Sequence, residues 1–333
     1  MKLIIQIPCL NEAESLPLAL ADLPQTLPGF DSIEVLVIDD GSTDETVEVA
    51  RSHGVEHIVR MHGHQGLARA FMAGIVAATE RGADVIVNTD ADNQYDARDI
   101  EALVKPILEG QADLVVGARP IGTIRQFSLL KRCLQSLGSR VVRTLSGSCV
   151  RDAPSGFRAM TRDAALRLNV FSGFSYTIET IVQSGLCNLR IVSVPVRVNE
   201  TLRPSRLFKS NASYVYRSIL TMLSVYIIYR PARIFGSLAA AFLAVGLALG
   251  IRYLVLMLLG EGTGHVQSVI ACGVFLLCGV FMAAMGVVAH LLSINRRLLE
   301  ELRYLARSRG REKLHDAAEQ EFGETLTEEH YWR

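Results

Sequence analysis

The chain has 333 residues, of which 50% are hydrophobic, and its 34 Lys and Arg balance 34 Asp and Glu. This composition excludes a disordered chain and a disulfide-stabilised miniprotein, and the lack of net positive charge argues against a nucleic-acid-binding protein. The balance hides a division, because residues 1–116 carry a net charge of −13, residues 117–233 of +14 and residues 234–333 of −1. We therefore expect the three parts to have different functions.

Five short runs of aliphatic and β-branched residues alternate with helix-compatible stretches such as 43–53 and 66–81. These runs occupy residues 3–7, 33–38, 55–59, 85–87 and 114–116. Nearly continuous apolar strands that alternate with helices predict an α/β fold, a mostly parallel sheet with helices on both faces. In such sheets ligands bind at the carboxyl ends of the strands, so the residues that follow each strand are candidate site residues.

Acidic and amide residues follow three of these strands. Asn11 and Glu12 come after the first strand, the stretch 39–44 (Asp-Asp-Gly-Ser-Thr-Asp) after the second, and residues 88–94 after the fourth. No GxGxxG or GxxxxGK[ST] pattern follows the first strand, which argues against the usual dinucleotide site and against a P-loop. The sequence therefore predicts a nucleotide site of another kind.

Asp90 and Asp92 stand two residues apart at the end of a strand, so extended backbone places both carboxylates on one side. With Gln94 nearby they offer hard oxygen ligands, which suit Mg²⁺ or Mn²⁺ held jointly with substrate phosphates. Loop aspartates more often form turns or helix caps, but the position of this pair among other strand-end acids favours a metal site. His62 and His64 lack a third ligand, which disfavours a zinc site.

Two long apolar runs near the C-terminus predict transmembrane helices. Residues 234–259 contain one charge, Arg252, and residues 265–294 contain no Asp, Glu, Lys or Arg. At about 1.5 Å per residue, either run exceeds the roughly 30 Å hydrocarbon core of a bilayer. The Gly-rich connector 260–264 predicts a hairpin whose open ends lie on one side of the membrane. Core helices of a soluble protein are the alternative.

Arginines flank the open ends of the predicted hairpin, with Arg230 and Arg233 before it and six more between residues 296 and 311. The positive-inside rule predicts a multi-pass protein of the cell (inner) membrane, with the N-terminal domain and both termini in the cytoplasm. Six cysteines without paired spacing agree with a reducing compartment. Residues 211–233, rich in tyrosine, suit an amphipathic helix in the headgroup region or, alternatively, a buried domain helix.

The strand-end motifs at 7–12, 37–44 and 90–92 resemble those of inverting glycosyltransferases of family 2 with the GT-A (Rossmann-like) fold. The stretch 152–158 (Asp-Ala-Pro-Ser-Gly-Phe-Arg), followed by 203–207 and a two-helix tail, is similar to polyprenyl-phosphate glycosyltransferases, the group of dolichyl-phosphate mannose and glucose synthases. Processive polysaccharide synthases of the family carry a QxxRW motif. The only tryptophan here is Trp332, which disfavours a chain-elongating synthase.

The resemblance implies that a membrane-bound enzyme moves one sugar from a UDP- or GDP-sugar to a polyprenyl phosphate, such as undecaprenyl or dolichyl phosphate, with Mg²⁺ or Mn²⁺ as cofactor. The implied nucleotide-sugar residues are Pro8, Asn11, Glu12, Asp39, Asp40, Gly66, Asp90 and Ala91. The implied metal ligands are Asp90, Asp92 and Gln94. The implied acceptor-phosphate residues are Arg119, Lys131, Arg132, Ser155, Arg203 and Arg206. The implied catalytic residues are Asp92, Arg119 and Arg206.

A phosphate monoester is largely dianionic at neutral pH, because its second pKa is about 6, so such an acceptor needs little help from a general base. Catalysis would then rest on positioning, charge stabilisation and the metal. Arginine suits the acceptor site because its guanidinium binds phosphate oxygens as a fork. Attraction of the basic residues to anionic lipid headgroups is the alternative explanation of the +14 segment.

Two other functions remain open at this stage. Transfer to a lipid or glycan hydroxyl would need a carboxylate base, such as Asp152 or Glu179. A non-catalytic, membrane-anchored nucleotide-sugar-binding protein is the second. Small residues at 236, 240 and 244 permit close packing of helices in a homo-oligomer. The predicted division of the chain is a GT-A catalytic domain at 1–210, the juxtamembrane helix at 211–233, two transmembrane helices at 234–294 and a cytoplasmic tail at 295–333, basic and then acidic.

Overall fold

The computed structural model describes residues 1–120, 139–144, 146–170, 176–199, 219–220, 223–224, 226–260 and 266–320, with side chains up to residue 308 in the last range. The chain forms two compact units. The first comprises Met1–Met222 with Leu302–Arg333, and the second comprises Leu223–Glu301.

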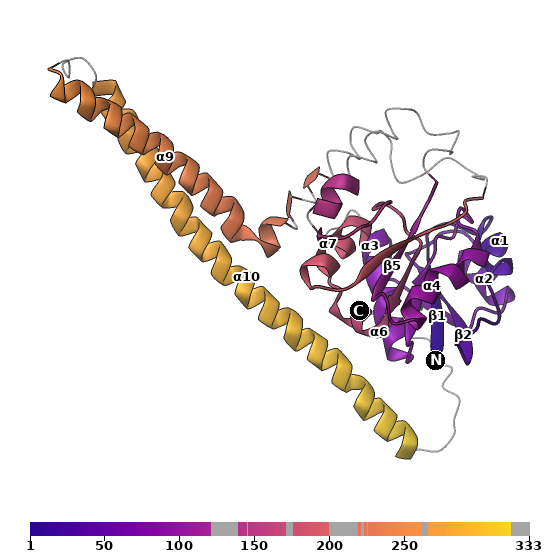
Figure 1. Cartoon of the computed structure of the whole chain (residues 1–333). Coiled ribbons are helices and arrows are strands. Elements are labelled where there is room, and N and C mark those ends of the chain that lie inside the picture. The colour runs from indigo at the N-terminus through magenta and orange to yellow at the C-terminus, as the bar shows by residue number, and fades with distance from the viewer. Residues whose placement is uncertain are drawn as a thin grey trace. The chain divides into compact units, whose positions relative to one another are not determined.

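The first unit contains a seven-stranded sheet in the order β3-β2-β1-β4-β6-β5-β7 (Figure 1). The strands are β1 (Lys2–Cys9), β2 (Ser32–Asp39), β3 (His57–Arg60), β4 (Val85–Asn88), β5 (Leu114–Ala118), β6 (Arg158–Thr161) and β7 (Ile191–Pro195). All pairs are parallel except those of β6, which runs antiparallel between β4 and β5. The predicted mostly parallel sheet is confirmed, and its five predicted strands are β1 to β5.

Helices cover both faces of this sheet, as predicted. Among the described residues, the helices of this unit include α1 (Leu16–Ala21), α2 (Thr46–Ser52), α3 (Leu67–Glu80), the 3₁₀ turn η1 (Ala97–Asp99), α4 (Ile100–Leu108), α6 (Arg162–Arg167) and α7 (Tyr176–Leu186). Leu3 and Ile5 of β1 pack in one buried cluster with Leu103 of α4. Gln6 points to the other face, where a Cβ at Gly74 of α3 would lie 2.5 Å from its Oε1.

Local chemistry explains where α2 begins. α3 occupies the stretch predicted at 66–81, and α2 begins three residues after the start predicted at 43. Asp44 forms a turn there, since its Oδ1 accepts a hydrogen bond of 3.1 Å from the backbone N of Thr46. This bond satisfies a donor that the helix itself leaves free.

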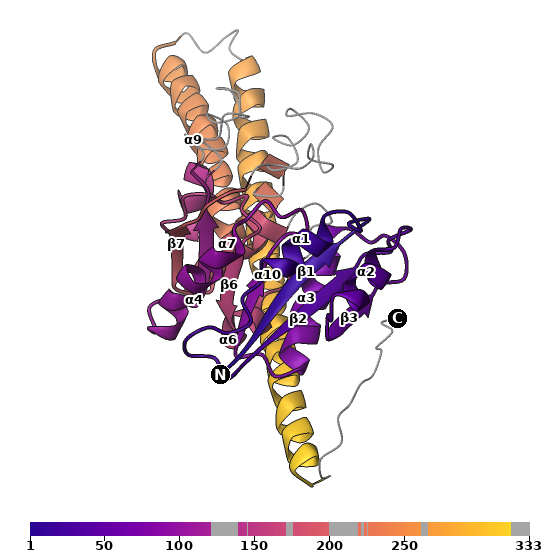
Figure 2. The ribbon, with the colours of Figure 1, turned by 90° about the vertical axis from the view of Figure 1, so that its right-hand side faces the viewer.

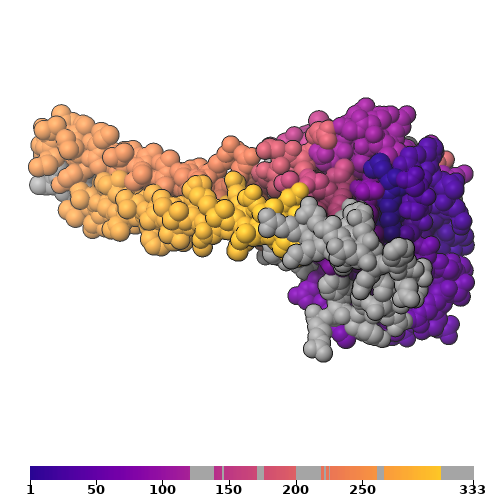
Figure 3. Space-filling model, turned by 90° about the horizontal axis from the view of Figure 1, so that it is seen from below, coloured from indigo at the N-terminus to yellow at the C-terminus, as the bar shows by residue number. Residues whose placement is uncertain are grey.

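The second unit contains two long helices that pack side by side, α9 (Pro231–Leu258) and most of α10 (Val266–Gln320) (Figures 1 and 2). Their surfaces meet closely in the space-filling view, α9 in orange and α10 in yellow (Figure 3). A Cβ at Gly246 would lie 3.0 Å from Leu276, and one at Gly279 would lie 2.7 Å from Leu243, so glycines permit this approach. Around Gly236 a Cβ would meet no atom within 4 Å, so that glycine does not serve the α9–α10 contact.

Polar contacts close the pair of helices at the end opposite to their connector. The hydroxyl of Tyr229, two residues before α9, donates to Oε1 of Glu300 at 2.9 Å. Nε of Arg296 donates to the same oxygen at 2.8 Å, and its guanidinium lies 4.9 Å from the centre of the Tyr229 ring. Of the predicted juxtamembrane helix, residues 211–218, 221–222 and 225 lie outside the described residues.

Candidate active site

The loops after β1 and β2 lock together at the carboxyl edge of the sheet. Asn11 accepts a hydrogen bond of 2.8 Å at Oδ1 from the backbone N of Thr43, and its own backbone N donates to Ser42 Oγ at 2.9 Å. The backbone N of Glu12 donates to Thr46 Oγ1 at 2.9 Å. Asn11 has a φ of 55°, the left-handed region in which asparagine is favoured among residues with a Cβ. The two predicted nucleotide-binding loops are therefore brought together and held rigidly.

Asp40 holds the loop that leads into α3. Its buried carboxylate accepts hydrogen bonds from Nδ1 of His64 at 2.8 Å, the backbone N of Gln65 at 2.7 Å and the backbone N of Gly66 at 2.9 Å. The neighbouring Gly41 has a φ of +79°, and a Cβ there would lie 2.6 Å from the carbonyl carbon of Gly63, in the loop that leads into α3. The side chain of Asp40 thus binds the backbone of Gly66, and beside it the backbones of Gly41 and Gly63 pack too closely for a side chain at position 41.

Asp39 and Pro8 are buried at the same edge, next to the ends of β2 and β1. Oδ1 of Asp39 accepts a hydrogen bond of 2.9 Å from the backbone N of Ser42. The guanidinium of Arg60 lies 3.8 Å from the other carboxylate oxygen. Asp39 therefore stabilises the turn after β2 with one carboxylate oxygen, and its other oxygen faces the half-exposed guanidinium of Arg60.

Asp90 and Asp92 lie together just after β4, both half-buried, and Ala91 between them is buried. Burial, and next the charge of Asp92, raise the pKa of Asp90 to about 7. Oδ1 of Asp92 accepts a hydrogen bond of 3.1 Å from the backbone N of Gln94. Two crowded carboxylates with an amide beside them fit Mg²⁺ or Mn²⁺, because a hard divalent cation prefers oxygen ligands and would relieve their mutual repulsion.

The backbone of Gly156 lies directly against the carboxylate of Asp90. A Cβ at this position would be 2.8 Å from Oδ2 of Asp90, so only glycine fits without displacing the acid. The carbonyl of Gly156 accepts a hydrogen bond of 2.8 Å from Nδ2 of Asn88, which also donates to the hydroxyl of Tyr176 at 2.9 Å. Gln6 donates to Oδ1 of Asn88 at 2.8 Å. A buried amide network therefore fixes the backbone beside the acidic pair.

Tyr95 connects the acidic loop to the loop of residues 152–156. Its hydroxyl accepts hydrogen bonds from the backbone N of Gly156 at 3.1 Å and from Oγ of Ser155 at 3.4 Å. Its ring stacks on Phe157 with 5.0 Å between centroids. Ser155, a predicted acceptor-phosphate residue, is fully buried here with its hydroxyl on Tyr95.

Arg158 stabilises the 152–156 loop through hydrogen bonds to its backbone. Its fully buried guanidinium donates to the carbonyl of Ser155 at 2.9 Å, to the carbonyl of Ala153 at 3.0 Å and to the hydroxyl of Thr180. Burial lowers the pKa of Arg158 to about 10, so the side chain stays charged at neutral pH. Two loop carbonyls therefore have one buried cation as their donor.

Arg119, which directly follows β5, binds Asp152 with three donors. Its Nε donates to Oδ2 at 2.7 Å, its Nη2 to Oδ1 at 3.1 Å and its backbone N to Oδ2 at 3.3 Å. Asp152 is fully buried, and the Arg119 side chain is 11% exposed. The structure thus brings Arg119 and Ser155 to one loop. Lys131, Arg132, Arg203 and Arg206 lie outside the described residues.

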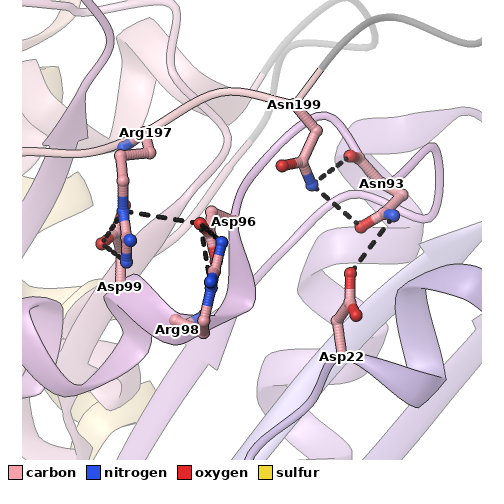
Figure 4. A network of polar contacts seen from close by, with 7 residues as sticks. All are labelled: Asp22, Asn93, Asp96, Arg98, Asp99, Arg197 and Asn199. Atoms are coloured by element: carbon pink, nitrogen blue, oxygen red, sulfur yellow. Dashed lines mark hydrogen bonds and ion pairs between the residues drawn. The ribbon is translucent and has the colours of Figure 1, made fainter.

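A second polar network joins the acidic loop to the segment after β7 (Figure 4). Nδ2 of Asn199 donates to the carbonyl of Asn93 at 3.0 Å, and the backbone N of Asn199 donates to the carbonyl of Gln94 at 2.9 Å. Beside them, Arg197 forms ion pairs with Asp99 at 2.6 Å and with Asp96 at 3.4 Å. These contacts fix the backbone on both sides of Gln94.

The sequence motifs gave no individual role to the supporting residues Asn88, Tyr95 and Arg158, among others. Asn88 ends the otherwise apolar strand β4, and a buried polar residue in such a place must find partners. That pattern is the one signal by which the amide network could have been found. Tyr95 contacts Gly156, 61 residues further along the chain, and Arg158 contacts Thr180, 22 residues further along. Local sequence patterns do not reveal such contacts.

Known proteins share both the sequence and the fold. Residues 4–165 match the model of Glycosyl transferase family 2. The chain is 32% identical over 206 residues to the undecaprenyl-phosphate mannosyltransferase of Micrococcus luteus, covering 59% of this chain and 83% of that protein. It is 28% identical over 310 residues to the glycosyltransferase AglJ of Haloferax volcanii, covering 90% of this chain and 97% of AglJ.

Among solved structures, glucosyl-3-phosphoglycerate synthase of Mycobacterium tuberculosis is similar, with a TM-score of 0.55 and 22% identity over 67% of this chain and 79% of that one. This likeness confirms the predicted GT-A fold, here followed by two long apolar helices.

Proposed function

We propose that this chain, which belongs to glycosyl transferase family 2, transfers one sugar from a UDP- or GDP-sugar to a polyprenyl phosphate at a membrane surface. One observation carries the proposal. The 152–156 loop presents Gly156 to the acidic pair of Asp90 and Asp92, and through Asp152 it binds the cation Arg119. A site for a metal-bound diphosphate and a site for a second phosphate therefore share one loop.

Asp90, Asp92 and Gln94 would hold Mg²⁺ or Mn²⁺. When bound, the ion would neutralise the negative charge that develops on the departing diphosphate. Structures of glucosyl-3-phosphoglycerate synthase of Mycobacterium tuberculosis contain UDP together with Mn²⁺ or Mg²⁺, and others contain UDP-glucose, which supports this donor class. The interlocked loops at Asn11, Asp39 and Gly66 would bind the nucleoside.

For the acceptor, the arrangement favours a phosphate over a hydroxyl. A phosphate dianion attacks without losing a proton, whereas a hydroxyl needs a carboxylate base. Asp152, one candidate base, is occupied by the three donors of Arg119, and Glu179, the other, is buried with 3% exposure. Arg119 would hold the phosphate as a fork and stabilise the charge during transfer. The name of the Micrococcus luteus relative points to the same class of acceptor.

The second unit would anchor the enzyme in the membrane. Pro231–Leu258 and Val266–Ser308 are long and apolar enough to cross a bilayer, and only 11% of the most apolar window of each is buried. A core helix of a soluble protein would bury most of these side chains. With Arg230, Arg233 and Arg296 at the open ends, we place the glycosyltransferase domain on the cytoplasmic side of the cell membrane.

The test uses the full-length protein in phospholipid nanodiscs with Mg²⁺ or Mn²⁺. A panel of UDP- and GDP-sugars is offered with undecaprenyl or dolichyl phosphate, and the matching free polyprenol serves as the control acceptor. We expect one donor to give a lipid-linked sugar phosphodiester and the alcohol to give none. Transfer to the alcohol would support the hydroxyl-acceptor alternative, and metal-dependent nucleotide binding without turnover would support the non-catalytic one.

A further inference from the structure

We propose that Asp152 is a positioning residue, which aims the guanidinium of Arg119 at the acceptor phosphate; this inference rests on the proposed function. Arg119 follows β5, and Asp152 lies on the loop that precedes β6, the antiparallel neighbour of β5. The two residues are 33 positions apart and meet only because these strands pair. Asp152 does not reach solvent, so its interaction with Arg119 is not weakened by water.

The ion pair with Asp152 uses one edge of the Arg119 guanidinium and leaves a second edge outside the pair. Asp152 binds Nε and Nη2, whereas no hydrogen bond reaches Nη1 from any residue that the structure describes. The Arg119 side chain as a whole keeps 11% of its surface exposed. The edge formed by Nη1 and the second N–H of Nη2 has the fork geometry that binds two phosphate oxygens.

The loop that carries Asp152 is itself immobilised. The backbone N of Ala153 donates to Oγ of Ser139 at 3.3 Å, and the backbone N of Ser155 donates to the carbonyl of Asp152 at 3.3 Å. Arg158 binds the carbonyls of Ala153 and Ser155. A guanidinium held by so rigid a partner is already oriented before the ligand arrives, which removes the entropic cost of ordering a long side chain.

The loop that carries Asp152 also contacts the donor site, since a Cβ at Gly156 would lie 2.8 Å from Oδ2 of Asp90. The charge of Arg119 acts on Asp90, where it opposes the effects of burial and of Asp92. A phosphate held by Nη1 and Nη2 would then bind at the same loop that contacts Asp90. Without Asp152, Arg119 would keep its positive charge, but its guanidinium would no longer be held in one orientation.

The test compares the kinetics of wild-type, Asp152→Asn and Asp152→Glu proteins in nanodiscs, with polyprenyl phosphate and the preferred nucleotide sugar. We expect Asp152→Asn to raise KM for polyprenyl phosphate about tenfold or more and to change KM for the nucleotide sugar less than about twofold. Asp152→Glu, which keeps the carboxylate, should recover part of the loss. In an Arg119→Lys background, Asp152→Asn should have little further effect, because lysine has no fork to aim.

Asp113 offers a matched control. It binds the backbone N, Nε and Nη2 of Arg190 at 2.8, 3.0 and 2.7 Å, the same set of donors, before β5 rather than after it. Asp113→Asn should leave both KM values unchanged.

The possible outcomes separate the two proposals. A wild-type protein that does not use polyprenyl phosphate would overturn the proposed function, and with it the acceptor named here. If the wild type uses it, an unchanged acceptor KM in Asp152→Asn would overturn the inference alone. Equal changes in both KM values, or additive effects with Arg119→Lys, would also overturn it. If Asp152→Asn does not fold, Asp152→Glu must show the acceptor-specific rise in KM by itself.

Discussion

The two ends of β5 carry ion pairs of the same design and different surroundings. At the amino end, Arg190 binds Asp113 with side chains that are 57% and 21% exposed; at the carboxyl end, Arg119 binds Asp152 with side chains that are 11% and 1% exposed. Three donors and one carboxylate recur in both places. The same salt-bridge geometry therefore occurs both in an exposed place and in one buried beside other polar groups, and only the second lies at the edge of the sheet that forms the candidate site.

The neighbourhoods of the two pairs extend this contrast. Around Asp152, a buried arginine, a buried tyrosine hydroxyl and a buried amide each hold the same loop. At the amino end, the remaining donor of Arg190 binds the carbonyl of Gly110, which is exposed. Polar groups buried at one end of a sheet cost free energy unless all are paired, so their concentration there indicates selection for something other than stability.

The largest expected effect comes from the acidic pair at the carboxyl end. Asp92→Asn removes a hard anionic ligand, so we expect sugar transfer to fall by a factor of about 100 or more, while the protein still inserts into membranes. Radiolabelled sugar transfer and membrane fractionation check these outcomes. Asp113→Asn is the control at the amino end and should transfer sugar normally. Near-normal transfer by Asp92→Asn would remove the metal assignment.

Replacing the buried arginine should have the next largest effect. Arg158→Met leaves two carbonyls and a hydroxyl without their donor, and we expect a loss of about 3 kcal/mol in the free energy of unfolding. Arg190→Met should cost clearly less than Arg158→Met, because the pair of Arg190 and Asp113 faces solvent. Thermal unfolding of the detergent-solubilised proteins measures both. Equal losses would contradict the distinction between the two ends.

The hydroxyl of Tyr95 should contribute less than Arg158. Tyr95→Phe leaves the buried backbone N of Gly156 without an acceptor, at a cost of about 1 to 2 kcal/mol. Because Gly156 lies against Asp90, we also expect weaker binding of Mn²⁺, measured by titration of the ion in the presence of UDP. A loss of stability with unchanged Mn²⁺ affinity would show that Tyr95 serves the fold and not the acidic pair.

The smallest effect concerns the amino end and depends on pH. Hydrogen bonds from Arg190 lower the pKa of Asp113 below its ordinary value of 3.8. Since the pKa is lower in the folded state, the pair contributes its full stabilisation above pH 3.8, and this contribution is lost as the pH falls from that value through the lower pKa of the folded state. We expect Asp113→Asn to reduce stability by less than about 1 kcal/mol at pH 6 and by a smaller amount at pH 3. A larger difference at pH 3 would contradict this assignment.

Much of the fold could be predicted because it depends on local patterns. Strands β1 to β5 are apolar runs, and the motifs at their ends identify the edge that forms the site. β6 was not predicted because its four residues, Arg-Ala-Met-Thr, begin with a charge and carry no β-branched run. β7, with Ile-Val-Ser-Val-Pro, has such a run, but it ends in a proline and lies outside the βα alternation on which the prediction rested.

The residues of the site were easier to name than their partners. Asp40 could be placed at the end of a strand, but not its three bonds to residues 64–66. Arg119 could be named from a motif, but its pairing with Asp152 depends on β5 and β6 becoming neighbours. Such contacts follow from the tertiary fold, which no local periodicity encodes.

The buried amides of Gln6 and Asn88 have a consequence for folding as well. They stand directly opposite each other in the register of β1 and β4, and apart from Lys2 the other residues of both strands are apolar. A slip of one residue would set Gln6 against Val87 and leave two amides unpaired in the interior. The hydrogen bond between Gln6 and Asn88 therefore makes a misaligned pairing of β1 and β4 unfavourable. Because Asn88 also binds the backbone of Gly156 beside Asp90, the correct register of these strands and the structure of the site depend on the same contact.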